Sequence, residues 1–546
     1  MVRICIALLV VMGSAVSVLG QSIPAGFPMV EEYLRRSQLL EKIDPNVSFL
    51  VRPVYPREIT NVQDAYSINK ISDDSISNPT FPGVQFFKGN GRMQLLPLSL
   101  QTEWNLRYPY PVASQHIPNR GWQTFASGGL YLEAGPLEVK FQPEFIWAQN
   151  KFYDPGINKS IYTEYEERFG DGPYRKLLPG QSSVRLNAGP FSVGYSTENI
   201  WWGPGQFNAL LFSNNAFGFE HLTLNTRKPV KTFLGYFETQ VIAGYLKGSE
   251  SRTNVSFINP SRYRFEDRYL NAFILTYQPK WTPGLSMGVS RVFQQYISMR
   301  GDSFSDYFPI FAPFQKVRSG FGRDAEGRDQ QATVFFRWAV PEGQAEFYFE
   351  YGRRDHEATW RGALLNPEHA RAFLFGFNKL FPVSNGAHIQ TRFELFHQQE
   401  SINILARYPG TTGRTNWGGH SPVIHGFTHR GQMIGPGIGP GSNVQTLETS
   451  WVKGIKKIGL RLDRLNRYQD RFVKDFNDFT PEQRWVDLAL GTIVEWKFNK
   501  LLISSNLTLV NSLNYQWQME PIDSRLVPKG KDMVNFQGNL KTIYLF

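Results

Sequence analysis

The sequence of 546 residues contains one cysteine, Cys5, and after its first twenty residues it has no long uninterrupted apolar run. A helix needs about 20 consecutive apolar residues to cross a bilayer. A chain whose only thiol stands at residue 5 cannot rest its stability on disulfides. It also has no cysteine nucleophile and no cysteine-based metal site in the rest of its length. These absences leave a chain without a helical membrane span, held together by packing and hydrogen bonds.

The first twenty residues have the pattern of a signal peptide. Arg3 supplies the positive start, residues 4–18 form a short apolar stretch, and the small residue Gly20 precedes Gln21. We expect residues 1–20 to be removed during export. The alternative is a membrane-anchoring helix, but the stretch is short and no stop-transfer pattern follows. Cys5 lies too far from the expected cleavage point to be a lipid-attachment cysteine.

The remaining chain also lacks obvious linkers, although its length would ordinarily indicate several domains. Its mean hydropathy is −0.34, yet aromatic residues make up 15% of the sequence. A membrane barrel needs apolar residues only at alternate positions, and its aromatic girdles add Phe, Tyr and Trp. This composition favours one large closed sheet. The net charge of +11 indicates either contact with an anionic glycan or lipid phosphate, or simply a basic lumen and loops.

We expect residues 21–90 to form a small helical or irregular section on the periplasmic side. Within it, residues 28–43 have the best helical pattern, because Val30, Leu34 and Leu40 recur at helical spacing and Pro28 suits a first turn. The region up to about residue 90 is rich in Asn, Ser, Asp and Pro. This section is a candidate for closing the periplasmic end of a barrel.

From there on we expect an outer-membrane β-barrel that covers residues 91–546. In residues 137–147 the odd positions are mostly apolar and the even positions mostly polar, which is a two-residue period over the length of a tilted membrane strand. The same alternation recurs in stretches at 233–245, 269–277, 285–293, 334–338, 347–351, 373–377 and 507–517. The sequence thus predicts an all-β, membrane-spanning antiparallel barrel.

Turns and loops alternate between these stretches. Residues 133–136, 187–190 and 341–344 have the composition of tight hairpins, and longer irregular stretches lie near 151–180, 246–266, 297–330 and 404–443. Residues 536–546 alternate again and end on Phe546, as in the last strand of bacterial outer-membrane barrels. At roughly 25 residues per strand and connection, the length gives about 16–18 strands.

Three segments carry a family signature. The first is Tyr-Ser-Thr-Glu-Asn-Ile-Trp-Trp-Gly-Pro-Gly at 195–205, continued by Ser-Asn-Asn-Ala at 213–216 and Phe-Gly-Phe at 217–219. The others are 350–353 with 367–372, and 425–432 with the glycine-rich run 435–443. Together they resemble the Wzi capsule-assembly family of outer-membrane proteins. The resemblance implies an eighteen-stranded barrel with N-terminal helices on the periplasmic side. It also implies a lectin-like role in holding capsular polysaccharide.

The first motif supplies four candidate ligand residues. On a strand, Trp201 and Trp202 would point to opposite faces, one ring into the lipid interface and the other onto a sugar or into the lumen. The alternative is a conformational corner that supports the barrel wall. Asn214 and Asn215 can donate to and accept from sugar hydroxyls, although they suit turns equally well.

Two long loops supply the other candidates. The loop at 297–330 is rich in aromatic residues, among them Tyr307. We expect Tyr307 to act with Lys316, Arg318 and Arg323 in binding an acidic polysaccharide. The alternative is a loop that folds inward and plugs the lumen. His425 and His429 are candidates for a polar ligand contact; their glycine-rich surroundings and lack of a nearby carboxylate argue against metal binding.

We therefore expect a non-enzymatic, lectin-like barrel in the Gram-negative outer membrane that attaches or organises surface or capsular polysaccharide. Its expected partners are outer-membrane lipid, the polysaccharide and other capsule-export components, with no nucleic acid and no cofactor. The alternative function is a channel for small solutes or for polymer export. A hydrolase is a weaker hypothesis, because no Gly-x-Ser-x-Gly element is present and residues 355–357 (Asp-His-Glu) alternate in direction on a strand.

Overall fold

A computed structural model describes residues 22–59, 83–87, 91–111, 116–154, 156, 163–251, 264–311, 327–354, 360–403, 416–420, 422–475, 483–518 and 530–546. The expected signal peptide and the Asp-His-Glu sequence at 355–357 lie outside these residues. Among the residues described, no helix combines the length and the apolar character needed to span a bilayer, a finding that does not bear on β-barrels.

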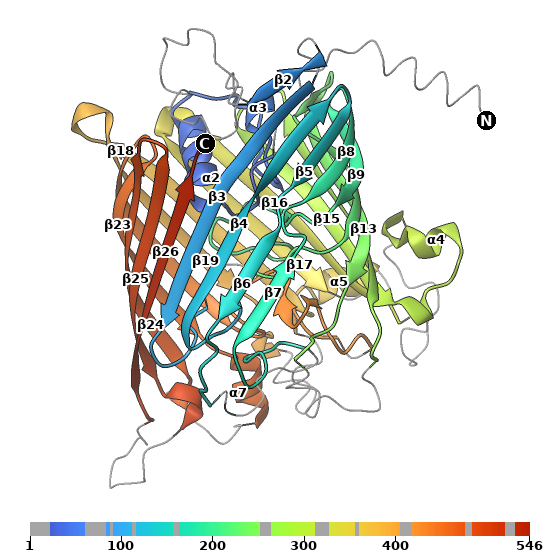
Figure 1. Ribbon diagram of the computed structural model, residues 1–546. Coiled ribbons are helices and arrows are strands. Elements are labelled where there is room, and N and C mark those ends of the chain that lie inside the picture. The colour runs from blue at the N-terminus through green and yellow to red at the C-terminus, as the bar shows by residue number, and fades with distance from the viewer. Residues whose placement is uncertain are drawn as a thin grey trace.

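The strands form a closed antiparallel barrel of eighteen strands, shown in Figure 1. In chain order they are β3 (Gly91–Asn105), β4 (Gly121–Ala134), β5 (Leu137–Phe141) with β6 (Glu144–Ala148), β7 (Tyr174–Leu178) with β8 (Ser183–Ala188), β9 (Phe191–Ser196), β11 (His221–Thr226), β13 (Gly235–Leu246), β14 (Arg268–Pro279), β15 (Leu285–Tyr296), β16 (Asp329–Val340), β17 (Ala345–Arg354), β18 (Arg371–Pro382), β19 (His388–His397), β22 (Asn443–Lys453), β23 (Lys456–Asn466), β24 (Val486–Phe498), β25 (Leu501–Leu513) and β26 (Met533–Tyr544). Two short strands, β2 (Val84–Phe86) and β12 (Val230–Lys231), extend the sheet at its edge.

The last strand closes the ring against the first. Residues 537–544 of β26 pair with residues 98–105 of β3 in antiparallel register. This pairing gives both strands a second neighbour, so neither presents a free edge. The predicted barrel is confirmed, and its strand number agrees with the count implied by the family resemblance.

Two predicted strands differ from the structure. The stretch 137–147 is divided into β5 and β6, because Pro143 cannot donate a backbone hydrogen bond and Gln142 instead pairs in parallel with Gly180. The stretch 507–517 ends as a strand at Leu513. Residues 515–517 form a 3₁₀ turn whose aromatic side chains are buried among loops.

Along the strands, apolar side chains face outward and polar side chains face inward, which is the reverse of the arrangement in a soluble protein. Outward positions carry exposed apolar side chains, such as Leu460, which is 55% exposed. Inward positions carry buried charges, such as Arg337, which is 1% exposed. This is the arrangement expected for a barrel with lipid outside and polar groups within.

The two ends of the barrel differ. At one end the strands are joined by short turns, and two of these consist of Gly135-Pro136 and Gly189-Pro190. Each glycine has a φ of +58°, the left-handed value that the first central residue of such a turn requires. At the other end the connections are long. We call these the short-turn end and the long-loop end; they lie at the top and bottom of Figure 1.

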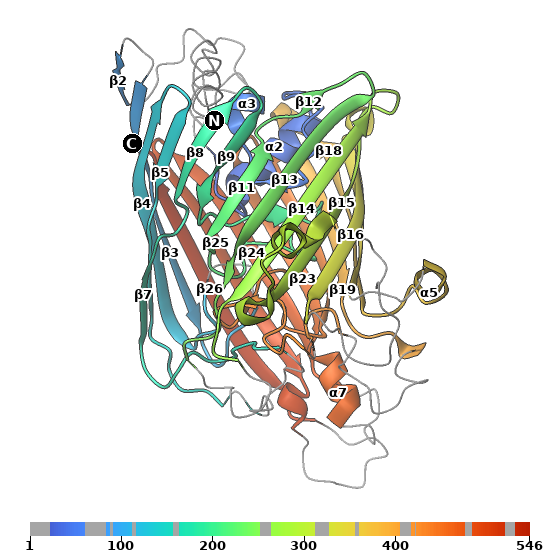
Figure 2. The same ribbon diagram turned by 90° about the vertical axis from the view of Figure 1, so that its right-hand side faces the viewer.

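Several described segments of the chain lie inside the lumen. Helix α2 (Pro28–Leu39) and the chain that follows it, including β1 (Val51–Arg52) and α3 (Pro56–Ile59), lie inside the wall near the short-turn end (Figures 1 and 2). The helix predicted over 28–43 is thus present but ends at residue 39. Strand β1 pairs with β10 (Trp201–Trp202), which belongs to the long connection between β9 and β11. A buried apolar cluster inside the barrel joins these segments to residues 417–438 of another long connection.

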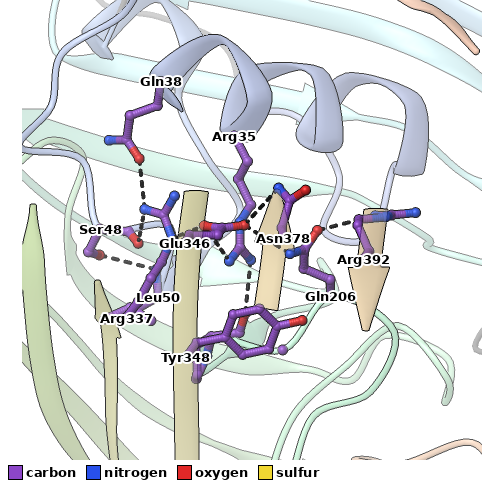
Figure 3. Close-up of polar contacts among 12 residues, drawn as sticks. Arg35, Gln38, Ser48, Leu50, Gln206, Arg337, Glu346, Tyr348, Asn378 and Arg392 are labelled. Atoms are coloured by element: carbon purple, nitrogen blue, oxygen red, sulfur yellow. Dashed lines mark hydrogen bonds and ion pairs between the residues drawn. The ribbon is translucent and has the colours of Figure 1, made fainter. Parts of the chain in front are cut away.

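Ion pairs and hydrogen bonds hold helix α2 against the wall (Figure 3). Glu346 on β17 is fully buried and accepts hydrogen bonds from Arg337 at 2.6 Å and from Arg35 of α2 at 3.1 Å. Arg337 also donates to Gln38 of α2 at 2.7 Å. We call residues 22–59 the lumenal plug. Its cations and the wall carboxylates neutralise one another inside the barrel.

Candidate functional site

Several long connections meet at the long-loop end and enclose a cavity whose lining includes six tyrosines. We call it the tyrosine cavity, and its lining includes Glu103, Tyr108, Tyr110, His116, Tyr153, Tyr165, Asn215, Gln432, Arg467, Tyr468, Trp485 and Tyr515. These residues come from six different connections or strand ends, so only the closed barrel brings them together. The cavity has a volume of about 60 Å³.

The rings of the cavity contact one another, Tyr108 and Tyr515 in a tilted arrangement and Trp485 and Tyr515 edge to face. The ring centroids of Tyr108 and Tyr515 lie 4.7 Å apart, and those of Trp485 and Tyr515 lie 5.1 Å apart. The guanidinium of Arg467 stands 4.9 Å from the Trp485 ring and pairs with Asp487 at 2.5 Å. Aromatic faces beside a cation suit the flat apolar face of a sugar ring and an acidic substituent.

Polar atoms with spare hydrogen-bonding capacity face the same cavity. Glu103 bonds to His116 Nδ1 at 2.9 Å, and Gln432 donates to the carbonyl of His116 at 2.9 Å. The buried atoms His116 Nε2 and Gln432 Oε1 have no hydrogen-bond partner within the described part of the chain. Buried polar atoms are ordinarily paired. These two atoms are therefore available to a ligand or to water.

The tyrosine hydroxyls remain neutral at physiological pH. Burial raises the pKa of Tyr153 and Tyr468 well above the usual value, and it also raises the pKa of Tyr515. Each hydroxyl therefore keeps its proton. Tyr153 donates its proton to the carbonyl of Glu167, and the hydroxyl of Tyr515 accepts from Gln516 at 3.2 Å. The cavity thus combines flat aromatic faces, one cation and neutral hydrogen-bonding groups, and within the described residues no group of histidines and carboxylates is arranged to hold a metal ion.

Both tryptophans of the first motif are buried inside the barrel, so the interpretation that one ring faces lipid is wrong. Trp201 lies under the guanidinium of Arg52 at 4.7 Å, and Trp202 donates to Gln240 at 2.8 Å. The reason is that β10 pairs with β1 of the plug and does not belong to the wall. Arg52 also donates to the carbonyls of Gly203 and Gly205, at 2.8 and 3.1 Å.

The glycines of this motif are required by close contacts. A Cβ at Gly203 would lie 2.5 Å from a carboxylate oxygen of Glu350, and this residue has a φ of +89°. A Cβ at Gly205 would lie 1.9 Å from the carbonyl oxygen of Asn208. The Trp-Trp-Gly-Pro-Gly motif therefore forms a tight crossing of the lumen, with the plug on one side and the wall on the other.

The two asparagines face different spaces. Asn215 lines the tyrosine cavity and donates to the carbonyl of Met433 at 2.8 Å. Asn214 lines a second cavity of about 250 Å³ between the plug and the wall, which Trp201 also lines. Trp201 Nε1 and Asn214 Oδ1 have no hydrogen-bond partner among the residues that the structure describes. Whether any of these four side chains contacts a polysaccharide stays a prediction.

The second cavity, which we call the plug cavity, has walls of mixed charge. Glu32 of α2 lies between Lys457, at 2.8 Å, and Arg392, at 3.1 Å. Burial alone would raise the pKa of Glu32, but Arg392, Lys457 and Arg36 together lower it to about 2. The carboxylate therefore stays ionised and its attraction to the cations fixes α2 in place.

The loop after β15 does not fold inward, so the alternative of a lumen plug formed by this loop is wrong for its described part. Residues 297–311 lie on the outer face of the barrel, in front of β14 and β15 in Figure 2. Tyr307 is part of this segment and its hydroxyl accepts from Arg300 at 2.9 Å. Lys316, Arg318 and Arg323 lie outside the described residues. The polysaccharide grip predicted for these four residues stays a prediction.

The histidine candidates are buried and neutral. His425 Nδ1 lies 2.9 Å from the hydroxyl of Tyr296, and His429 Nδ1 accepts from the backbone of Lys247 at 3.1 Å. Burial, with a contribution from Arg268, lowers the pKa of His425 to about 2. Burial also lowers the pKa of His429 well below its usual value. Both rings hold the long connection 416–442 against neighbouring segments.

Sequence reasoning missed most of the tyrosine cavity. Tyr108, Tyr153, Tyr468 and Tyr515 are scattered over more than 400 residues and follow no period. The only sequence feature that could have pointed to this cavity is the presence of many aromatic residues in the irregular stretches between strands. That signal locates a class of residues but not the contacts among them.

Comparison with known proteins agrees with the motifs. The sequence profile of a family described as capsule assembly protein Wzi matches residues 130–511. Among solved structures, the chain is similar to Wzi of Escherichia coli, described as an outer-membrane protein involved in group 1 capsule assembly and as a carbohydrate-binding β-barrel. The identity is 11%, the match covers 95% of this chain and 99% of that chain, and the TM-score is 0.60. This likeness establishes a shared fold.

Two further structures, both from Pseudomonas aeruginosa, are more remote. OccD3 (OpdP) matches at 9% identity over 88% of this chain and 98% of its own, with a TM-score of 0.39. OpdQ matches at 9% identity over 84% of this chain and 99% of its own, also with a TM-score of 0.39. No curated protein sequence matches significantly. The profile match spans most of the barrel and all three motif segments, and the chain therefore belongs to the Wzi capsule-assembly family.

Proposed function

We propose that this protein is a non-enzymatic, lectin-like barrel of the Gram-negative outer membrane that attaches or organises surface or capsular polysaccharide. The observation that carries the proposal is the tyrosine cavity: aromatic faces, Arg467 and the unpaired atoms of His116 and Gln432 converge at one end of the barrel. Membership of a capsule-assembly family supports the substrate class. The other capsule-export components are further partners under this proposal.

The orientation follows from the connections. Outer-membrane barrels have short periplasmic turns and longer external loops. The short-turn end, with the lumenal plug, would then face the periplasm, and the tyrosine cavity would face outward. Because about 60 Å³ accommodates only part of a sugar unit, we expect one ring or substituent to enter the cavity while the rest of the polymer lies outside it.

The proposal is tested first by binding. Purified protein in detergent would be applied to an array of neutral and acidic bacterial polysaccharides. Replacing Tyr515 by Leu, or His116 by Phe, should weaken binding by about tenfold, since one aromatic contact or hydrogen bond accounts for about 1.4 kcal/mol. Trp281→Leu is the matched control, because Trp281 is an exposed aromatic residue at the short-turn end. Equal binding by all variants would contradict the assignment of the cavity.

The second test is made in cells. Deletion of the gene should lower cell-attached polysaccharide and raise the amount shed into the medium. Complementation with the wild-type gene should restore attachment, and complementation with the Tyr515→Leu variant should not. If attached and shed polysaccharide are unchanged by deletion, the retention role is wrong.

A channel function is the alternative, and the packing of the lumen argues against it. The plug, β10 and residues 417–438 together form one buried apolar cluster inside the wall. A lumen occupied in this way supports a closed barrel. Planar-bilayer recording separates the two functions, because a closed barrel gives no steady current.

A further inference from the structure

The described segment 297–311, which we call the outer-wall strap, lies against the outside of the barrel, in the half nearer the long-loop end. It consists of η3 (Ile297–Met299), α4 (Phe304–Tyr307) and η4 (Pro309–Phe311). Figure 1 shows it projecting beside the wall, and Figure 2 shows it across the outer face of β14 and β15. The two views agree that it lies outside the barrel.

The strap covers polar side chains on a face that otherwise meets lipid. Val289 on β15 points outward and is 42% exposed, and Arg291, two residues further along the same strand, points to the same side. Arg291 is nevertheless only 2% exposed. It donates to the carbonyl of Ile310 in the strap at 3.1 Å and to Gln330 on β16 at 2.7 Å.

Arg291 lies far enough from the end of its strand that, without the strap, it would face the acyl chains of the membrane. It lies five residues before the end of β15 at Tyr296, or about 16 Å along the strand. An arginine that faced acyl chains at such a position would be unfavourable. Asn271 on β14, which pairs with Phe293 across the sheet, is covered on the same face and is fully buried. The strap therefore takes the place of lipid against a polar part of the wall.

The outer side of the strap is apolar, whereas the wall residues beneath it are polar. Pro309 and Ile310 are buried toward the wall. Phe304 and Phe311 point away from it and are 71% and 70% exposed, and Phe308 lies between them with ring centroids at 4.9 and 6.5 Å. The aromatic row thus continues the exposed apolar face formed by outward residues of the wall, such as Leu275, Val289 and Val334.

Several contacts fix the strap in this position. The hydroxyl of Tyr269 on β14 donates to the carbonyl of Tyr307 at 2.6 Å. The guanidinium of Arg300 stands 4.8 Å from the Tyr269 ring and 4.0 Å from the Tyr307 ring. Ser303 and Asp306 cap the start of α4 through reciprocal hydrogen bonds. The segment is therefore an ordered part of the outer surface, with a row of phenylalanines held away from the wall.

From these contacts we propose that the outer-wall strap is a lipid-binding element: Phe304, Phe308 and Phe311 insert among the acyl chains at the interface of the membrane leaflet on the long-loop side. The occupant is lipid, because the row is continuous with the lipid-facing wall and because an interfacial element typically sets its aromatic face into the acyl boundary. The strap seals the polar patch beneath it and anchors the barrel at a fixed depth.

The test uses single cysteine variants of the full chain, since Cys5 is the only native cysteine and lies in the expected signal peptide. Phe304→Cys and Phe311→Cys would carry a nitroxide label in purified protein reconstituted into phospholipid vesicles. Val289→Cys is the lipid-facing control, and Lys474→Cys, exposed on α7 (Gln469–Asp475) at the long-loop tip, is the aqueous control. Collisional accessibility to oxygen and to a water-soluble nickel chelate would be measured at each site.

The strap positions should match the lipid control, with several-fold higher accessibility to oxygen than to the chelate, and the Lys474→Cys label should show the opposite ratio. Higher accessibility to the chelate at both strap positions would overturn the proposal. Low accessibility to both reagents would also overturn it, since another copy of the protein would then cover the strap. The accessibility of the labels does not depend on polysaccharide binding, so this test can fail without affecting the proposed function.

Discussion

Removal of the charge on Glu346 should release the lumenal plug. Glu346 has no exposed surface and is the shared partner of Arg337 and Arg35, whose side chains are 1% and 2% exposed. It also accepts from Gln206 at 2.9 Å and from Asn378 at 3.2 Å. In Glu346→Gln two guanidiniums would stay buried without their carboxylate, while a new amide donor would face them.

The magnitude follows from this geometry. Breaking a buried ion pair by removing one partner costs about 3–5 kcal/mol. The two pairs share one carboxylate, so their contributions do not add. Arg35 keeps its bond to the carbonyl of Pro204, and Arg337 keeps its bond to Gln38, which limits the loss. At 1.4 kcal/mol for each factor of ten, the population of undocked plug should rise by about a hundredfold or more.

The assay uses Ser37→Cys in α2 as a reporter, because Ser37 is buried in the docked plug and no other cysteine follows residue 5. When undocking is fast relative to labelling, the rate of reaction with a thiol reagent follows the undocked population. Glu342→Gln, at an exposed position in the turn before β17, is the matched control and should leave the rate unchanged. If Glu346→Gln labels no faster than the control, the ion pairs do not hold the plug.

Three further predictions follow from the same packing. The stabilisation from Glu32, whose pKa is lowered to about 2, should be complete above about pH 4.5 and decline as the pH falls toward 2. Acid should therefore raise the labelling rate of the reporter relative to that of an exposed cysteine, Lys474→Cys, at the same pH, and less so in Glu32→Gln; the ratio removes the loss of thiolate at low pH. Gly205→Ala should lower the temperature of heat-induced unfolding on gels, since its Cβ would meet a backbone oxygen at 1.9 Å, whereas Gly172→Ala, with open space around it, should not. The wild-type protein should give no steady current in planar bilayers, and Glu346→Gln should give intermittent openings; a steady wild-type current would contradict the closed lumen.

Local pattern located part of the wall of the barrel. The stretches at 269–277 and 285–293 alternate with a period of two, and they correspond to β14 and β15. Hairpin composition located the turns at Gly135 and Gly189, because few residues tolerate a positive φ. These features depend on neighbouring residues along the chain, so they can be read without knowing what lies across the sheet.

The limits of local pattern appear where the chain leaves the wall. Trp201 and Trp202 have the composition of a membrane strand, yet β10 pairs with β1 across the lumen, and both rings are buried. The loop after β15 has aromatic residues that suit either an inward or an outward fold, and its contacts with Tyr269 and Arg291 place it outside. Periodicity specifies alternate faces but not which partner covers them.

The sequence by itself determined that the chain forms a β-barrel, where some of its strands and tight turns lie, and to which family its motifs point. Only the tertiary structure decided that several segments lie inside the lumen, that residues such as Tyr108 and Tyr515 form one cavity, and that a strap covers Arg291. The physical reason is that alternation is a local requirement of a sheet in lipid. The contacts of long connections form only when closure of the ring brings distant segments together.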